Sequence, residues 1–183
     1  MVALAAAKAG PRARLAVHDM RELPVLGEFD LITCLDDALN YLLERQELVA
    51  ALRGMRRNLA PAGVVVADVN TIATYRGFFA DLDVLAEEDR VLVWRGGGSP
   101  RVRPGERVDA ALEVLARADD GPWRSAIHTH RQRHHPAAAM RTALSAAGLE
   151  PVAIRGVTPD GRLHERADEL AHTKVVYIAR AAG

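Results

Sequence analysis

The sequence predicts an α/β fold with a largely parallel sheet, and three observations support this. First, an apolar strand pattern at 31–35 is followed by a helical pattern over 46–59 and by a second apolar strand at 64–68. Strand, helix and strand in this order are typical of a right-handed crossover between parallel strands. Second, both strands are apolar on either face, as strands of a buried parallel sheet are. Third, two more apolar segments, 151–157 and 174–180, follow near the end of the chain.

The helix over 46–59 is the clearest element of the chain. Apolar side chains recur along it at helical spacing and form one stripe, while arginines lie away from the stripe. The stripe consists of Leu48, Leu52, Met55 and Leu59. The turn at 61–63 separates this helix from the strand that follows it.

The first twenty residues are predicted to form a helix and a short strand. Residues 2–9 are alanine-rich and favour a helix, which Gly10 and the next proline would end. The segment 14–18 is a strand candidate. Asp19 and Met20 follow it, where the carboxylate could accept a hydrogen bond from an adenine amino group while the methionine packs on the ring. The alternative is an aspartate turn followed by a core methionine.

The composition excludes several classes of protein. Basic and acidic residues balance at 24 each, so no charged field favours nucleic acid. No apolar run approaches the roughly 18 residues of a membrane-spanning helix. The one cysteine, Cys34, excludes an internal disulfide and is typical of a reducing cytoplasm. We therefore expect a single domain over 1–183 that is cytoplasmic and binds neither nucleic acid nor membranes.

Residues 72–135 are predicted to form an antiparallel insert on the parallel core. Turn-rich stretches divide this region into about three extended segments. The segments are 90–96, 107–118 and 124–135. Pro136 then opens a helix that Gly148 closes.

Polar side chains gather where the two core strands end. Asp36 and Asp37 follow the first strand, and Asn70 follows the second. Ligands of open α/β sheets bind outside the carboxyl ends of the strands. The two aspartates could hold an amine or a metal or act as a base, or they could cap the next helix. Asn40 and Tyr41 come one turn later and face the same cleft, unless Tyr41 is ordinary half-buried packing.

The stretch "HTHRQRHH" is the richest in chemistry. Its alternate residues share one face if it is a strand. His130 on that face is a candidate general base. Histidines two apart without a companion carboxylate motif are a weak zinc signal, so we expect no metal. The alternative for the whole stretch is a solvated polar face.

The order of the motifs resembles the class I S-adenosylmethionine-dependent methyltransferases, above all the small-molecule type with an antiparallel insert after strand 5. The matching segments are "VHDMRELP", "FDLITCLDDALNYL", "LRGMRRNLAPAGVVVADVNT", "HTHRQRHH", "MRTALSAAGLEPV" and "KVVYIAR". The resemblance implies a Rossmann-like sheet of order 3-2-1-4-5-7-6 with strand 7 antiparallel. It also implies S-adenosylmethionine as methyl donor and a small-molecule acceptor methylated at N, O or C.

The resemblance assigns expected roles to individual residues. Asp19 and Met20 match adenine-contacting positions, and Cys34, Leu35 and Asp36 match the segment that lines the methionine moiety of the cofactor. His130 is the expected base, with Asp37 and Tyr41 as the next candidates. The side chains expected to bind the acceptor are Asn40, Asn70, Tyr75, Gln132 and Arg133.

One departure from the family affects the expected sheet. The first strand, the glycine-rich loop and the acidic residue after the second strand have no counterpart in the sequence. We therefore expect a partial, N-terminally truncated methyltransferase domain whose sheet lacks its first two strands. The strand at 31–35 would then present an unpaired apolar edge. This motivates an alternative function, a non-catalytic remnant or interaction module that pairs with another chain, and a homodimer through that edge.

Overall fold

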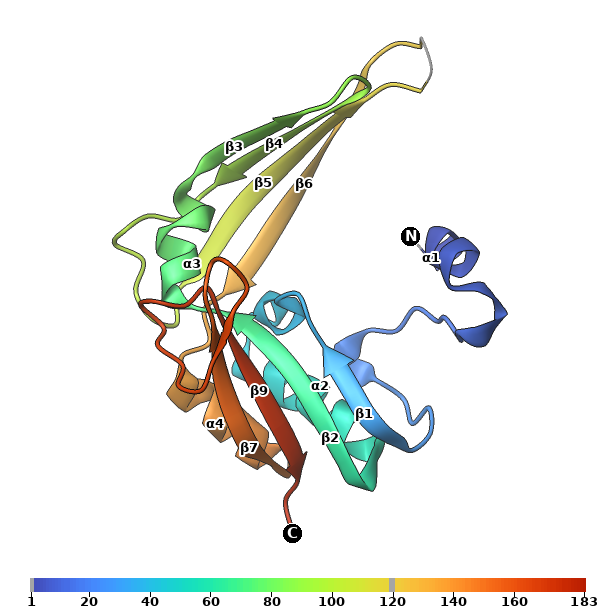
Figure 1. Cartoon of the computed structure of the whole chain (residues 1–183), viewed down its shortest axis with the longest axis vertical. Helices are drawn as coiled ribbons and strands as arrows, with labels where there is room; N and C mark the ends of the chain where they lie inside the picture. Colours follow the sequence, from blue (N-terminus) through green and yellow to red (C-terminus); the bar gives the residue numbers. More distant parts are fainter. Residues whose placement is uncertain (1, 119–120) are drawn as a thin grey trace.

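The computed structural model describes residues 2–118 and 121–183, which form two sheets, and helices cover one face of the first sheet (Figure 1). The first sheet has the strand order β1-β2-β9-β7-β8 and the second has the order β3-β4-β5-β6. The longer elements are α1 (Val2–Ala9), β1 (Phe29–Cys34), α2 (Arg45–Arg57), β2 (Leu59–Asn70), α3 (Ile72–Arg76), β3 (Leu82–Ala86), β4 (Arg90–Gly96), β5 (Arg107–Ala116), β6 (Arg124–Arg133), α4 (Ala137–Ala146), β7 (Leu149–Val157), β8 (Leu163–His164) and β9 (Lys174–Ala181). Single turns of 3-10 helix are η1 (Gly10–Arg12), η2 (Met20–Glu22), η3 (Ala38–Tyr41) and η4 (Phe78–Ala80).

The first sheet has the predicted α/β topology. β1 and β2 pair in parallel and α2 connects them, as the strand-helix-strand pattern predicts. β9 lies between β2 and β7 and is antiparallel to both. The order β1-β2-β9-β7 therefore matches the 4-5-7-6 half of the expected sheet, and the α/β class is confirmed.

The main core lies between this sheet and the helices α2 and α4. Leu48, Leu52 and Met55 of α2 are buried, and they pack in one cluster with Met140 and Leu144 of α4. Burying a leucine side chain is worth about 1.5–3 kcal/mol, so this stripe is a major part of the stability. The helix begins with a reciprocal capping box between Glu44 and Glu47 and ends before Asn58. Leu59, expected on the same helix, is instead the first residue of β2.

Two expectations about the strands near the amino terminus are wrong. The segment 14–18 is not a strand, and Leu15 and Val17 are 42% and 80% exposed. A strand is stable only in a ladder, and no described segment pairs with this one. β1 was expected to be buried on both faces, but Phe29 and Leu31 are exposed because β1 is the edge strand of its sheet. Residues 61–63, expected as a turn, fall inside β2 at a shift of its register with β1.

The second sheet is the predicted antiparallel insert, with four strands rather than three. The missed strand, β3, pairs with β4 along five residues that are all exposed, so it has no buried stripe to reveal it. The sheet projects from the first one as an arm (Figure 1). Its inner end packs on α3 and η4 through a small cluster of apolar residues. This cluster consists of Ile72, Tyr75, Phe79, Val102, Val108 and Ala110, with Trp94 packed against it.

Three successive glycines allow the arm to approach the helices closely. A Cβ atom on Gly98 would lie 2.2 Å from the carbonyl oxygen of Tyr75, and one on Gly96 would lie 2.0 Å from that of Phe79. The amide of Gly98 donates to the Phe79 carbonyl at 2.7 Å. The run therefore serves the packing of the arm against α3 and η4. Within the described residues, no helix is both long enough and apolar enough to cross a membrane.

Candidate functional site

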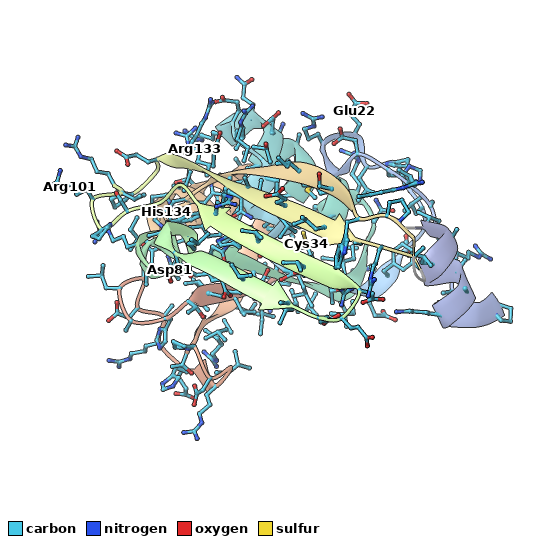
Figure 2. The ribbon with its side chains drawn as sticks, turned by 90° about the horizontal axis from the view of Figure 1, so that it is seen from above. Glu22, Cys34, Asp81, Arg101, Arg133 and His134 are labelled. Atoms are coloured by element: carbon cyan, nitrogen blue, oxygen red, sulfur yellow. The ribbon has the colours of Figure 1, made fainter. Side chains whose placement is uncertain are left out.

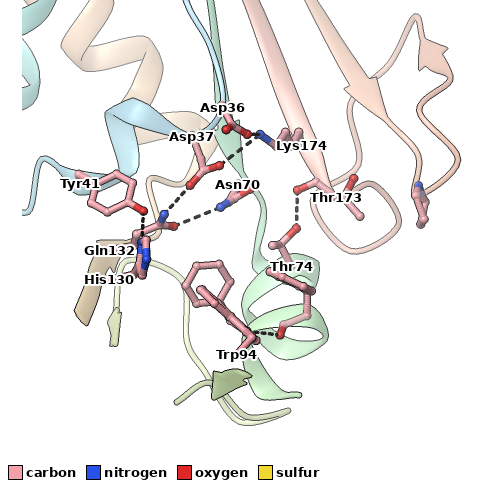
Figure 3. Close-up of a pocket in the computed structure, with 13 residues that line it drawn as sticks. Asp36, Asp37, Tyr41, Asn70, Thr74, Trp94, His130, Gln132, Thr173 and Lys174 are labelled. Carbon is pink, nitrogen blue, oxygen red and sulfur yellow. Dashed lines mark hydrogen bonds and ion pairs between the residues drawn. The ribbon is translucent and has the colours of Figure 1, made fainter. Parts of the chain in front are cut away.

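A cavity of about 470 Å³ opens where the two sheets meet. It lies beyond the carboxyl ends of β1 and β2, beside the start of β9 and against the inner ends of β4 and β6 (Figure 3). Acidic and amide side chains form one wall and aromatic rings form the other. The location agrees with the rule that ligands bind outside the carboxyl ends of strands in α/β sheets.

The acidic wall is organised by a single lysine. The ammonium nitrogen Nζ of Lys174 lies 3.3 Å from Asp36 Oδ1, 3.2 Å from Asp37 Oδ1 and 3.1 Å from Asp68 Oδ2. Burial opposes the charge of Lys174, but its hydrogen bond and attraction to Asp68 and its attraction to Asp37 outweigh burial and raise the pKa of the amine. The lysine is therefore a fixed cation in the wall.

Asp36 and Asp37 form a strained turn directly after β1. Their φ angles are 63° and 52°, in the left-handed region that non-glycine residues rarely adopt. Such residues cost of the order of 1–3 kcal/mol each and persist where their surroundings hold them. The amide of Asp37 donates to Asp68 Oδ1 at 2.8 Å. The Asp37 carboxylate does not cap the following turn, because it accepts hydrogen bonds from Gln132 and Lys174 instead.

A buried amide network supports Asp37 from below. Gln132 donates through Nε2 to Asp37, and its Oε1 accepts from Asn70 Nδ2 at 3.1 Å and from the Tyr75 hydroxyl at 3.0 Å. Asn40 Oδ1 accepts from the backbone N–H of Asn70 at 2.9 Å. Burial raises the pKa of the Asp37 carboxyl, while the Gln132 hydrogen bond and the Lys174 charge act against that rise. Residues of both sheets thus fix the position of one carboxylate.

The opposite wall carries His130 and the four aromatic rings of Tyr41, Phe78, Phe79 and Trp94. The Tyr41 hydroxyl lies 2.6 Å from Nδ1 of His130. Trp94 packs against His130 with ring centroids 5.5 Å apart, and Phe78 stacks on Trp94 at 5.1 Å. Nε2 of His130 is buried and has no hydrogen-bond partner among the described residues. This imidazole is therefore oriented through one nitrogen and has the other one uncommitted.

The structure brings most of the predicted acceptor residues together. The cavity is lined by five of them, Asp37, Tyr41, Asn70, His130 and Gln132, and also by Asp36, which was predicted to contact the cofactor. Asn40 and Tyr75 are fully buried beneath it and act through the amide network. Arg133 does not line this cavity, because its guanidinium donates to the carbonyls of Gly105 and Leu43 at 2.9 and 2.8 Å. Strand alternation explains this, since Gln132 lines the cavity and the next residue of β6, Arg133 (labelled in Figure 2), points to the other face.

The residues predicted to contact the cofactor lie along β1 and η2. Asp19 caps η2 by accepting from the Arg21 amide at 2.9 Å, and hydrogen bonds from Arg21 lower the pKa of its carboxyl to about 2. Met20 packs against the main core. Cys34 is buried, and burial followed by the charge of Asp68 raises the pKa of its thiol to about 11, so it is a poor nucleophile. Leu35 and Asp36 are exposed at the carboxyl end of β1. The contacts of all five residues with the cofactor stay predictions.

Sequence reasoning missed Lys174 and the aromatic wall. Lys174 is one of only two lysines in the chain, and it is the first residue of the last strand. Both features can be recognised in the sequence. An antiparallel strand beside parallel ones begins at the edge where those strands end, so its first residue belongs to the site. Phe78 and Trp94 gave no comparable signal, because their stacking depends on the packing of β4 against η4.

Comparisons with known proteins agree on one family. Residues 1–63 match the family model described as "Methyltransferase domain". A curated protein of Geobacillus sp. (strain WCH70), whose name assigns it provisionally to the methyltransferases, is 27% identical over 183 residues, which are 98% of this chain and 71% of that protein.

Solved structures share the fold of this chain. A S-adenosylmethionine-dependent methyltransferase from Clostridium acetobutylicum ATCC 824 superposes with a TM-score of 0.79 at 18% identity, over 99% of this chain and 70% of that one. A sugar N-methyltransferase from Streptoalloteichus sp. ATCC 53650 gives a TM-score of 0.69 at 25% identity, with coverage of 98% and 67%. An amino pentose methyltransferase from Micromonospora echinaspora gives 0.64 at 26% identity, with coverage of 98% and 69%.

Proposed function

Because the chain is a class I S-adenosylmethionine-dependent methyltransferase, we propose that it methylates an amine nitrogen of a small, ring-shaped acceptor. One observation carries this proposal. The cavity sets the carboxylates of Asp36 and Asp37 on one side and the rings of Phe78 and Trp94 on the other. Anionic groups and aromatic faces both attract an alkylammonium ion.

The size and lining of the cavity support a small ring as acceptor. A volume of about 470 Å³ is in the range of small-molecule sites. A ring could lie against Trp94 while its amine points toward Asp37. Two of the structural neighbours are named as a sugar N-methyltransferase and an amino pentose methyltransferase. Their names support an amino sugar as the acceptor class of this chain.

His130 is the proposed base. An amine reaches the cavity as an ammonium ion, and it becomes a nucleophile only after a proton leaves the nitrogen. The uncommitted Nε2 of His130 can accept this proton when Nδ1–H donates to the Tyr41 oxygen. Tyr41 is then the residue that orients the ring. Asp37 holds the acceptor amine rather than removing its proton, because Gln132 and Lys174 already engage its oxygens.

We expect the methyl donor to lie over the end of β1. Leu35 offers an exposed apolar side chain there, and Asp36 offers a carboxylate whose side chain is 97% exposed. Bound S-adenosylmethionine supplies an activated methyl group on a cationic sulfur, and transfer is an in-line displacement. The chain contributes position and exclusion of water to that step.

Competition between matched acceptors tests the proposal. We would incubate the chain with S-adenosylmethionine and pairs of small five- and six-membered rings that differ only in an amine or a hydroxyl group, and follow S-adenosylhomocysteine. We expect turnover with the amine of a pair and at least about tenfold less with its hydroxyl twin, because only the ammonium ion pairs with Asp37. Equal turnover of both twins would contradict the proposal.

A second candidate role concerns the edge of β1. Phe29 and Leu31 are 42% and 56% exposed on this edge, and edge strands with apolar side chains invite pairing with another chain. We infer self-association of two copies through β1. Sedimentation of the wild-type chain should show a concentration-dependent dimer that Leu31→Lys converts to a monomer. A wild-type monomer at all concentrations would exclude self-association, and binding of the cofactor by that monomer would argue against the interaction-module alternative.

A further inference from the structure

Lys174 lies at the point where the charges of the site converge. Its ammonium group contacts three carboxylates, and its side chain is only 25% exposed. Asp37 and Asp68 are still less exposed, at 17% and 10% of their side chains. The three acids come from the β1 turn and from the end of β2, and the lysine comes from the first residue of β9.

Strand pairing holds the backbone of Lys174 in place independently of the three acids. Lys174 pairs with Asn70 of β2 on one side and with Val157 of β7 on the other, so its backbone lies in the interior of the ladder. The strained turn at Asp36 and Asp37 has no such support of its own. Its described tethers are the Asp68 carboxylate, which accepts from the backbone amide of Asp37, the ammonium group of Lys174, Gln132 beneath it, and the backbone amide of Asn40, which donates to the Asp37 carbonyl at 2.9 Å.

We propose that Lys174 is a positioning residue that holds the turn and supplies the counter-charge by which Asp37 stays an anion able to pair with an acceptor amine. The proposal rests on the proposed function for the identity of the acceptor. The coupling between Lys174 and Asp37 is independent of that function, because it is a property of the free protein.

The charges around Asp37 explain why a cation is needed there. The titratable groups around it are Asp36 of its own turn, Tyr41 of η3, Asp68 of β2, Tyr75 of α3 and Lys174 of β9. His130 of β6 is connected to it through its hydrogen bond with Tyr41. Among the described residues, Lys174 is the only permanent cation that bonds Asp37. Without it, the neighbouring carboxylates of Asp36 and Asp68 and a buried environment would all favour the protonated, uncharged form of Asp37.

An ordinary structural ion pair is the competing explanation. A structural role concerns shape and folding, whereas the proposed role concerns the charge at Asp37. Lys174→Met retains most of the apolar stem and removes the charge, while Lys174→Arg retains the charge. Lys8→Met is the matched control, because Lys8 is the other lysine and is exposed on α1.

Carboxyl-carbon NMR of the 183-residue chain tests the charge directly. We would titrate the side-chain carbon of Asp37 in the wild type and in the three variants. We expect the Asp37 midpoint to rise by about one to two pH units in Lys174→Met and to stay near the wild-type value in Lys174→Arg and Lys8→Met. An unchanged midpoint in folded Lys174→Met would overturn the proposal, as would an equal rise in Lys174→Arg.

The reciprocal measurement covers the case in which Lys174→Met does not fold. Coupling between two titrating groups is mutual, so the Lys174 amine must respond to Asp37. Reductive methylation with a ¹³C label gives only two lysine signals in this chain. We expect Asp37→Asn to lower the Lys174 midpoint and to leave Lys8 unchanged. An unmoved Lys174 midpoint would overturn the proposal.

Turnover measurements distinguish a failure of the proposed function from a failure of the coupling between Lys174 and Asp37. If amines prove not to be acceptors while Asp37 and Lys174 stay coupled, the proposed function fails and the coupling stands. If amines are methylated, Lys174→Met should lower kcat/KM for the amine most strongly at acidic pH, while Lys174→Arg stays near the wild type. The reason is that fewer Asp37 side chains are then ionised at a given pH.

Discussion

The two sheets of the molecule bury their residues very differently. In the first sheet, alternate residues of β2 and β9 are almost completely buried under α2 and α4, including Val65, Val69 and Val175. In the second sheet, β3 is exposed throughout and β6 becomes buried only from Gln132 onward. We therefore call the first sheet the scaffold, because its residues form the main core, whereas most side chains of the arm are at least partly exposed to solvent. The site forms where the buried end of the arm meets the scaffold.

The largest expected effect lies at that junction, on the arm side. His130→Ala should lower kcat/KM for the amine acceptor by about 10²-fold or more, because proton removal by a positioned base contributes roughly 10²–10⁴-fold. His128→Ala is the matched control, since His128 lies two residues outward on β6 and is exposed. Retained activity with an unchanged pH profile in His130→Ala would remove His130 from the role of base.

The scaffold side gives the next effect, on stability. Leu52 is fully buried between α2 and the rest of the main core. Leu52→Ala should lower the free energy of unfolding by about 2–5 kcal/mol, because it removes apolar contacts and leaves a cavity. Urea titration of the two proteins measures this. A loss below about 1 kcal/mol would show that the main core is not the stabilising part of the molecule.

The junction should also make stability depend on pH. Burial is the main cause that lowers the pKa of His134 to about 4, from 6.5 in an unfolded chain. The folded state therefore binds fewer protons than the unfolded state between these values, so stability is full above about pH 6.5 and falls as the pH drops toward 4, by up to about 3 kcal/mol. Urea titrations from pH 7 to pH 4.5 should show a shallower loss in His134→Gln than in the wild type. Equal slopes would contradict the assignment.

The outer part of the arm should give the smallest effect. Leu85 on β3 is 54% exposed and contributes nothing to either apolar cluster. Leu85→Ala should change the free energy of unfolding by no more than about 0.5 kcal/mol, as exposed substitutions usually do. A loss as large as that of Leu52→Ala would mean that the arm is covered in solution and that the contrast between the two sheets is wrong.

The same contrast explains what could be predicted from the sequence. Elements of the scaffold have strong local signals, such as the stripe of Leu48, Leu52 and Met55 and the closing Gly148, and they were predicted closely. The strand at 14–18 was predicted from the same kind of local pattern and failed, because pairing with a neighbour decides whether a strand forms. β3 escaped detection because its side chains are exposed on both faces.

The site divides in a similar way. Asp36, Asp37 and Asn70 were found because strand ends in an α/β sheet share one edge. The contact of Tyr41 with His130 joins residues 89 positions apart, and the stacking of Phe78 on Trp94 depends on how β4 packs. Such contacts follow from the tertiary arrangement of the two sheets, which no local pattern in the sequence encodes.

The central claim is that the cavity between the sheets directs a methyl group to an amine nitrogen. It is tested most directly by ¹³C NMR of the product formed from S-adenosylmethionine labelled in its methyl carbon, with a ring that carries both an amine and a hydroxyl group. The account predicts a single new signal of a carbon bonded to nitrogen, lost in His130→Ala and kept in His128→Ala. A methyl carbon bonded to oxygen, or a product that forms equally well in His130→Ala, would contradict it.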